Sequence, residues 1–594
     1  MTEFSAPLAD LQFTLTHIAE IEKITRFPGY EEATPDIIDA ILEQSGKFAE
    51  QVLAPLNRSG DQQGCRIENG IVYTPDGFKD AYEQMSEAGW HGISLPQEYG
   101  GQGLPYTLSI AASEMSTGAN MAFMLIPQLI QSATELIAQH GSENQKATYL
   151  PNIVAGKWST TMNLTEPQAG SDLNLLTTKA VPKDDHYRIT GQKIFITGGD
   201  HDLTENIIHL VLARTPDAPE GLKGISLFLV PKFLVNEDGT LGPRNDLKCV
   251  SIEHKLGIHG APTCVMSYGD DKGAIGYLIG VENQGLMGMF TMMNLTRLLV
   301  GIQGPAIGER AYQQAVSYAK ERLQGTDQSG TTVAIIEHPD VKRMLLDMKA
   351  KTEACRCITI YTAACLDHAK RAPDDDERQR FLSRTELLTP IAKAWATDRG
   401  IEIANTGIQV HGGNGFIEET GAPQHLRDIR IAAIYEGTNG IQAKDLVSRK
   451  IIRDNGVALA ELSAEIAELV RVMGTLKDEA LRDVSLQLTR CLIELDEATA
   501  WIRENAEEDI EAVLASASDY LDLLGTICAG WLLAKCAVKA SELIGQEGSN
   551  DLFLKGKILS CRYFSDHDLS RCTQLKTTIL KGPSSILAVD PEML

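Results

Sequence analysis

The sequence predicts a mainly helical protein with a central β domain. Segments with apolar residues at helical spacing occupy both ends of the chain, and short β-type runs separated by turn residues fill the middle. At 594 residues the chain is also too long for one hydrophobic core. We therefore expect four domains: an N-terminal helical domain (1–160), a middle β domain (161–282), a helical bundle (283–452) and an additional helical domain (453–594).

The first domain is predicted to be helical from its apolar spacing. Between Ile38 and Leu56 the apolar residues fall near one helical face. Gly and Pro interrupt this pattern in the loop 95–105, and helical patterning resumes from Thr107 to about Ala155.

The second domain contains the β-type runs 186–197, 207–214 and 224–233. Gly, Asp and Pro separate these runs, which is typical of a compact β domain. Strands do not alternate with helices here, so a doubly wound nucleotide-binding sheet is excluded.

The remaining chain is predicted to be helical, with long stretches at 286–324, 340–371 and 384–407 that suit a bundle, and a last helical segment at 456–594. The most apolar stretch, Leu521–Ala540, carries one Asp and two Lys residues. A buried helix therefore explains it better than a membrane span.

Composition excludes several classes of function. The chain has 54 Lys+Arg against 80 Asp+Glu, a net charge of −26, which disfavours nucleic acid and anionic membranes as partners. The N-terminal residues lack a basic segment followed by an apolar one, so we expect no secretory signal and a cytoplasmic protein. Eleven scattered cysteines without C-x-x-C support neither a disulfide framework nor a zinc site, and no metal is expected.

Two motifs lie in the β domain. In MNLTEPQAGSD (162–172), small residues would let the backbone approach an anionic ligand, but the same residues make a good polar turn, and the motif alone does not decide. In GQKIFITGGD (191–200), Phe195 and Thr197 are two residues apart, so both should lie on one side of a strand. They suit contact with a flat heterocycle, although spacing alone favours an ordinary half-buried strand.

Three further motifs follow in the helical part. QVHGGNGFIEE (409–419) is rich in glycine for backbone contact with a ligand, but it lacks the dinucleotide fingerprint and could simply end a helix. In IRIAAIYEGTNGIQ (429–442), Glu436 follows an apolar run whose desolvation would strengthen a base, while Thr438 and Asn439 suit a helix cap. For an arbitrary glutamate, a role in a capping turn is the more common one. Arg297 lies among Met and Leu residues and needs an anion or an ion pair.

Together the motifs resemble a known family. T-E-P-x-A-G-S-D, G-x-K-x-x-I-T, Q-x-x-G-G-N-G-F and Y-E-G-T occur here in the order found in acyl-CoA dehydrogenases. The resemblance covers about residues 36–452, with an acyl-CoA dehydrogenase-like fold implied. The long form with a helical C-terminal addition is similar to a bacterial subgroup that includes 3-(methylthio)propanoyl-CoA dehydrogenases.

The resemblance implies FAD-dependent conversion of an acyl-CoA to the trans-2-enoyl-CoA, with Glu436 as the base and Thr296 where some relatives place theirs. Asn294 and Arg297 match substrate-binding positions near CoA. The positions that match FAD contacts are Met162, Leu164, Thr165, Ser171, Phe195, Thr197, Arg322, Gln409, Gly412, Gly413 and Thr438. Arg322 departs from the family's R-x-x-F-G because the Phe is missing, so contacts at the adenine end are less well supported. Electron-transferring flavoprotein as acceptor and a homodimer are implied as well.

The sequence also allows three alternative functions. An acyl-CoA oxidase performs the same half-reaction and passes electrons to oxygen, and the sequence hardly separates it from a dehydrogenase. A nucleic-acid-associated homologue needs a basic C-terminal surface, whereas residues 456–594 have 13 basic and 23 acidic residues. A catalytically silent scaffold is disfavoured by the intact Y-E-G-T motif. Acyl chain length, any preference for a sulfur-containing acyl group, the role of residues 453–594 and assembly beyond a dimer stay open.

Overall fold

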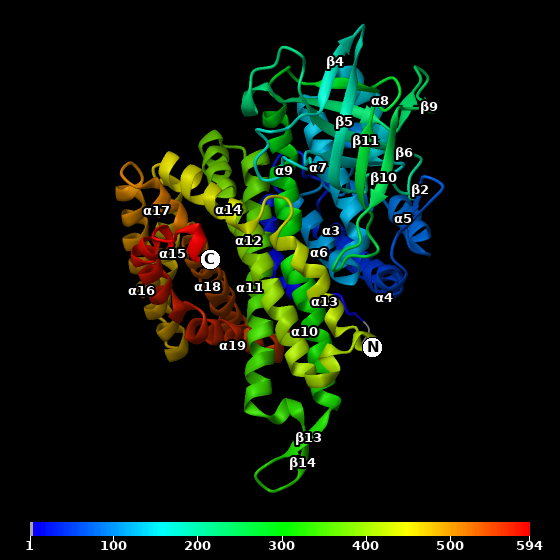
Figure 1. The fold of residues 1–594 in the computed structure, drawn as a ribbon. Coiled ribbons are helices and arrows are strands. Elements are labelled where there is room, and N and C mark those ends of the chain that lie inside the picture. Colours follow the sequence, from blue (N-terminus) through cyan, green and yellow to red (C-terminus); the bar gives the residue numbers. More distant parts are fainter. Residues whose placement is uncertain (1–3) are drawn as a thin grey trace. The chain divides into compact units, whose positions relative to one another are not determined.

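The computed structural model describes residues 4–594, which form two compact units (Figure 1). Unit 1 comprises the residues up to 42 together with 110–118 and 300–594, and unit 2 comprises 43–109 and 119–299. Unit 1 is therefore assembled from both ends of the chain, and unit 2 from its middle.

An eight-stranded sheet forms the centre of unit 2, in the order β10-β11-β5-β12-β7-β6-β3 with β4 added beside β5. β3 and β6 pair in parallel and the other neighbours are antiparallel. Fully buried apolar side chains such as Val211, Phe228 and Val230 form the core of the sheet. The strands are β3 (Trp158–Asn163), β4 (Lys179–Lys183), β5 (His186–Thr197), β6 (Asn206–Ala213), β7 (Ser226–Pro231), β10 (Leu247–Ile252), β11 (Thr263–Tyr268) and β12 (Ala274–Ile279).

The long strand β5 spans the whole predicted run 186–197, but its end is not regular. The pairing register with β11 shifts between Cys264 and Met266, where two residues of β5 oppose one of β11. Phe195 lies in this bulge with φ of 59°, a left-handed backbone conformation that a side-chain-bearing residue seldom adopts. The bulge interrupts the two-residue period between Lys193 and Ile196. Beyond Ile194 the burial still alternates, with Phe195 exposed, Ile196 buried and Thr197 half-buried, and a shared side for Phe195 and Thr197 stays a prediction.

Unit 2 also contains helices and a small hairpin. The hairpin, β1 (Arg66–Glu68) and β2 (Ile71–Tyr73), was not predicted within the helical N-terminal part. Its turn residues Asn69 and Gly70 both have positive φ, as a two-residue hairpin turn requires. The main helices of this unit are α4 (Ala54–Gln63), α5 (Phe78–Glu87), α7 (Met121–His140), α8 (Glu143–Val154) and nearly all of α9 (Gly285–Gly301).

Unit 1 is a helical bundle around two long antiparallel neighbours, α11 (Pro339–Arg371) and α12 (Asp375–His411). The predicted helical stretch 286–324 contains α9, which belongs mostly to unit 2, and α10 (Gln303–Glu321), which belongs to unit 1. After α10 the chain forms an exposed hairpin, β13 (Leu323–Thr326) and β14 (Thr332–Ala334), that was not predicted. The other main helices are α1 (Leu8–His17), α3 (Pro35–Phe48), α6 (Tyr106–Ala119), α13 (Ala422–Ile429), α14 (Asn439–Asp445), α15 (Val457–Met473), α16 (Glu479–Asn505), α17 (Ile510–Ala515), α18 (Ala517–Leu543), α19 (Asp551–His567), α20 (Cys572–Lys581) and α21 (Pro583–Leu587).

The C-terminal helices of unit 1 pack closely on the bundle. α18 contacts α11, α12 and α14, and the indole Nε1 of Trp395 in α12 donates a 3.2 Å hydrogen bond to Thr526 Oγ1. Three helical stretches of the described residues, 121–140, 285–321 and 517–543, are long and apolar enough to cross a membrane by length and composition, and most of each lies buried inside the fold. The last includes Leu521–Ala540, which packs as the predicted buried helix.

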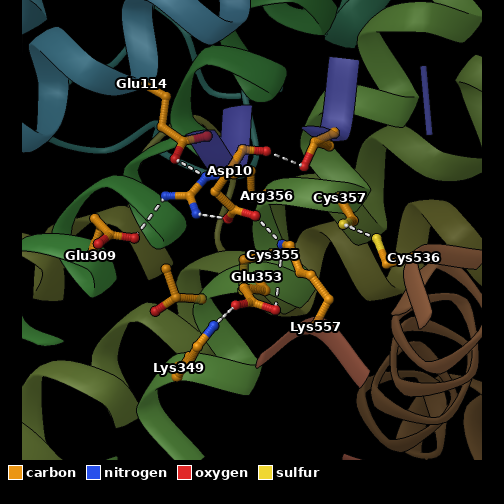
Figure 2. Close-up of polar contacts among 12 residues, drawn as sticks. Asp10, Glu114, Glu309, Lys349, Glu353, Cys355, Arg356, Cys357, Cys536 and Lys557 are labelled. Carbon is orange, nitrogen blue, oxygen red and sulfur yellow. Dashed lines mark hydrogen bonds and ion pairs between the residues drawn. The ribbon is translucent and has the colours of Figure 1, made fainter. Parts of the chain in front are cut away.

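A buried cluster of charged side chains ties the two ends of the chain together in unit 1 (Figure 2). Arg356 of α11 donates from Nε to Glu114 at 2.7 Å and from Nη2 to Glu309 at 3.0 Å, and it also contacts Asp10. Lys557 of α19 pairs with the same Asp10 (Figure 2). The N-terminal helix α1 is thus linked to α19 by the Asp10–Lys557 ion pair and to α11 by the Asp10–Arg356 ion pair.

Candidate active site

The predicted site residues fall into two groups, one in each unit. In unit 2 the group is built on the segment after β3 and the end of β5. Met162, Leu164, Thr165 and Thr197 are half-buried, whereas Ser171 and Phe195 are exposed. The main-chain N–H of Ile194 donates to the Thr165 carbonyl at 3.0 Å, so these two segments lie side by side.

A fully buried ion pair fixes this arrangement. Lys193 Nζ of β5 donates to Glu166 Oε1 at 2.8 Å and to the Leu164 carbonyl at 3.0 Å. Glu166 also accepts hydrogen bonds from the main-chain N–H and hydroxyl groups of Thr177 and Thr178. Each carboxylate oxygen therefore has several donors, as a buried charge requires. The pair holds the TEPQAGSD segment against the strand that carries Phe195.

The two predicted substrate-binding residues lie on one face of α9, three residues apart. Asn294 is exposed and Arg297 is buried, with Arg297 Nη1 3.5 Å from Asn294 Oδ1. The structure thus places both predicted residues together within unit 2.

The group in unit 1 centres on Glu436, which lies in a turn of unusual backbone geometry. Glu436 has φ of 56° and Gly437 has φ of 86°, so two successive residues are left-handed. Such a conformation is unfavourable for glutamate and persists only where the surroundings enforce it. The Glu436 side chain is half-buried.

Three helices hold this turn. Tyr435 OH donates to Gln303 Oε1 of α10 at 2.6 Å, and burial raises the pKa of Tyr435, so the phenol keeps its proton. Lys393 Nζ of α12 donates to the Gly437 carbonyl at 2.8 Å. Thr438 caps α14 as predicted, because its hydroxyl accepts from the Ile441 main-chain N–H at 3.2 Å.

The predicted adenine-end residues lie at the C-terminal end of α12 and of α10. Gln409, Gly412, Gly413 and Arg322 are all exposed. A Cβ added at either glycine would meet nothing within 4 Å, so both leave room for a ligand or a partner chain. The neighbouring His411 has the ordinary role of a packed histidine: its ring stacks on Tyr318 and bonds the Gly407 carbonyl at 2.7 Å, and burial lowers its pKa.

Several contributing residues were not assigned roles from the sequence: Glu166, Lys193, Lys393 and Gln442. Asn439 was expected to suit a helix cap, but Thr438 alone is the cap and the Asn439 side chain bonds to α12 instead. Glu166 and Lys193 lie within quoted motifs, and a lysine at an inward position of an otherwise apolar strand indicates a buried charge partner. Lys393 stands similarly in the apolar stretch IAKAWAT of α12. Its acceptors come from a turn more than forty residues later, which no local pattern reveals.

Family comparisons match nearly the whole chain. "Acyl-CoA dehydrogenase, N-terminal domain" matches residues 37–157, the middle domain 161–270, the C-terminal domain 283–451, and "Acetyl-CoA dehydrogenase C-terminal like" 460–590. The chain belongs to the acyl-CoA dehydrogenase family. This acyl-CoA dehydrogenase has both the helix–β–helix order of the family and the additional C-terminal domain.

Individual relatives are similar to this enzyme over almost its whole length. It is 43% identical over 588 residues to 3-methylmercaptopropionyl-CoA dehydrogenase of Ruegeria pomeroyi, which covers 98% of this chain and 99% of that protein. It is 36% identical to a butyryl-CoA dehydrogenase of Syntrophomonas wolfei, covering 94% of this chain and 93% of the relative. A solved structure of Caenorhabditis elegans ACDH-11 with C11-CoA shares the fold, with a TM-score of 0.75 over 96% of this chain and 93% of that one at 20% identity.

Proposed function

We propose that this acyl-CoA dehydrogenase binds FAD and converts an acyl-CoA thioester to its trans-2-enoyl-CoA, with Glu436 as the base. The observation that carries the assignment is the turn at Glu436. A half-buried carboxylate on a left-handed backbone, held by contacts from α10, α12 and α14, is placed far more rigidly than a capping turn requires.

The residues of unit 2 fit FAD. Ser171 and the glycine before it are exposed, and a Cβ at Gly170 would meet nothing within 4 Å, so the backbone there is open to an anionic group. The Phe195 ring is 60% exposed, which is unusual for a phenylalanine beside a buried strand core and suits contact with a flat ring. Met162, Leu164, Thr165 and Thr197 complete the proposed flavin contacts. Gln409, Gly412, Gly413, Arg322 and Thr438 are proposed contacts of the rest of the cofactor, some of them across a homodimer.

The chemistry requires removal of a weakly acidic proton from Cα of the thioester. Glu436 accepts this proton, and its own main-chain N–H is proposed to donate to the thioester carbonyl, where negative charge develops. FAD, when bound, would supply the acceptor for the hydride that leaves Cβ. Asn294 and Arg297 would hold the CoA part, and a fixed Glu436 lowers the entropic part of the barrier.

For the substrate we propose 3-(methylthio)propanoyl-CoA or a short- or medium-chain acyl-CoA, with electrons passing to electron-transferring flavoprotein in the cytoplasm. The proposal rests on full-length similarity to a 3-methylmercaptopropionyl-CoA dehydrogenase and to a butyryl-CoA dehydrogenase. The two acyl groups have similar lengths. 3-(Methylthio)propanoyl has a sulfur atom where butyryl has its terminal carbon, and one further methyl group is bonded to that sulfur.

The decisive experiment is an anaerobic titration of the purified yellow protein with acyl-CoAs of increasing chain length, including 3-(methylthio)propanoyl-CoA and butyryl-CoA. We expect the flavin bands to bleach with the short thioesters in the wild type and in Glu419→Gln, which alters an exposed carboxylate. We expect no bleaching in Glu436→Gln. Colourless protein that FAD does not reconstitute would refute the flavoenzyme, and bleaching by Glu436→Gln would refute the base.

A further inference from the structure

Lys393 is one of the largest fully buried side chains of unit 1, and it contacts the turn that carries Glu436. Its Nζ lies 2.8 Å from the Gly437 carbonyl and 2.8 Å from Asn439 Oδ1. The side chain is 0% exposed. Removing an ammonium from water is costly, so a lysine is retained at such a position only where its hydrogen bonds replace its hydration.

The same short segment of α12 also holds Asn439, two residues after Gly437 and at the start of α14. Asn439 Nδ2 donates to the Ala394 carbonyl at 3.2 Å, to Thr397 Oγ1 at 3.1 Å and to Asp398 Oδ1 at 2.7 Å. Asn439 therefore bonds to Lys393 through its oxygen and to three groups of α12 through its nitrogen. This arrangement fixes the orientation of its amide as well as its position.

Lys393 bonds to the same turn in which Glu436 and Gly437 have the unfavourable left-handed backbone conformation. Gln442 Nε2 also donates to these two carbonyls, at 3.4 Å from the Glu436 oxygen and 3.3 Å from the Gly437 oxygen. Both distances are long for a hydrogen bond, and the Lys393 contact to Gly437 is much shorter. A charged donor also makes a stronger bond than a neutral amide.

We propose that Lys393 is a positioning residue for Glu436: it holds the left-handed turn from the buried side and so fixes where the carboxylate points. This inference rests on the proposed function, because it assigns to Lys393 the placement of the proposed base. Lys393 does not exchange protons with the substrate in this role. Loss of the lysine should slow proton removal while leaving thioester binding almost unchanged, since Asn294 and Arg297 lie elsewhere in the sequence.

The test compares Lys393→Met with Lys557→Met, which removes another buried lysine of unit 1 far from the turn in sequence. The limiting rate of flavin bleaching should fall about 10- to 100-fold in Lys393→Met, with the half-saturating thioester concentration changed less than about threefold. Lys557→Met should bleach at nearly the wild-type rate at a temperature where it is folded. Affinity for acetyl-CoA, which has no Cβ hydrogen to lose, measured by calorimetry, should be the same in all three proteins.

Amide hydrogen exchange over residues 435–445 provides a readout that does not need turnover. These amides should exchange at least tenfold faster in Lys393→Met than in the wild type and in Lys557→Met. If Lys393→Met does not fold, Asn439→Ala replaces it, because it removes the second acceptor of the ammonium.

The outcomes distinguish a failure of the positioning role of Lys393 from a failure of the proposed function. Wild-type bleaching rate together with wild-type exchange in Lys393→Met would overturn the positioning role. Equal slowing in Lys557→Met would overturn it too, since the effect would then be general destabilisation. If no thioester bleaches the wild type, the proposed function fails, and the exchange of residues 435–445 still decides whether Lys393 holds the turn.

Discussion

Lys193 Nζ lies 2.8 Å from Glu166 Oε1, and the two side chains are 0% and 1% exposed. This ion pair joins strand β5 to the segment that precedes Ser171. Burial disfavours the charged form of Glu166, but the Lys193 ammonium and the hydrogen bonds from Thr178 and Thr177 outweigh it and lower the pKa of Glu166 to about 2. The carboxylate is therefore ionised, and its charge depends on the lysine.

Lys193→Met should strongly destabilise unit 2, because it leaves the buried Glu166 carboxylate without its cation. We expect a loss of about 3–5 kcal/mol in the free energy of unfolding, measured by urea denaturation, and less flavin retained after purification. Lys193→Met combined with Glu166→Gln should recover part of the loss, because no buried charge then remains. Lys179→Met, at an exposed site of β4, is the control. Equal losses in the single and double variants would contradict this account.

Glu114 should make stability fall as the pH rises toward neutrality. Burial raises its pKa to about 7, and the nearby Glu309 and Asp10 act in the same direction against the opposing Arg356. The folded protein then binds a proton that the unfolded chain releases above about pH 4.5, so folding is favoured below that pH and weakened as pH rises through 7. The full effect is about 3 kcal/mol.

Glu114→Gln should remove this dependence, because glutamine does not titrate and can still accept from Arg356. Urea denaturation between pH 5 and pH 8 measures the pH dependence of the free energy of unfolding. Glu419→Gln, at an exposed site, is the control. The stability of the wild type relative to Glu114→Gln should decline over that range. Parallel curves for the two proteins would show that Glu114 is ionised throughout.

Thr438→Val should weaken the start of α14, because valine has the shape of threonine but no oxygen for the Ile441 N–H. We expect a loss of about 1 kcal/mol in the free energy of unfolding and a slower limiting rate of flavin bleaching. Thr438→Ser keeps the hydroxyl and should remain close to the wild type in both measurements. A slowed Thr438→Ser would indicate that the methyl group, and not the cap, is what matters.

Gly525→Ala should disturb the contact between α18 and α12. A Cβ at this position would lie 2.5 Å from Trp395 Cδ1, which forces the indole or the helix to move. We expect a loss of about 1–3 kcal/mol in thermal unfolding. Gly556→Ala in α19 is the matched control, because its nearest neighbour would be Lys349 Cε at 3.9 Å and alanine favours a helix. A loss of the same size in both variants would count against a specific α12–α18 contact.

The sequence predicted elements well where a strong local pattern coincides with burial. The run 186–197 is strand β5, and the stretch 340–371 lies within helix α11, because period-2 and helical spacing reflect the faces that each element buries. The hairpin after α10 was missed because its two strands are mostly exposed and have no buried face to impose a pattern.

The site was predicted in part for a similar reason. Motif residues such as Glu436 and Thr438 could be recognised along the chain, and the cap at Thr438 was confirmed. The left-handed Phe195 could not be predicted, since its bulge depends on pairing with β11, about seventy residues later. The base assignment and the cofactor contacts stay predictions that the proposed titration tests.

The ion pair between Asp10 and Lys557 joins residues 547 positions apart, and this has a consequence for how the protein is made. A ribosome releases all of unit 2 by residue 299, so the β domain can fold while synthesis continues. Helix α1 has no complete binding site until α19, more than five hundred residues later in the chain, has been synthesised. Helix α1 therefore reaches its native contacts late, and a chain truncated before α19 would contain the β domain but would leave Asp10 of α1 without its Lys557 partner.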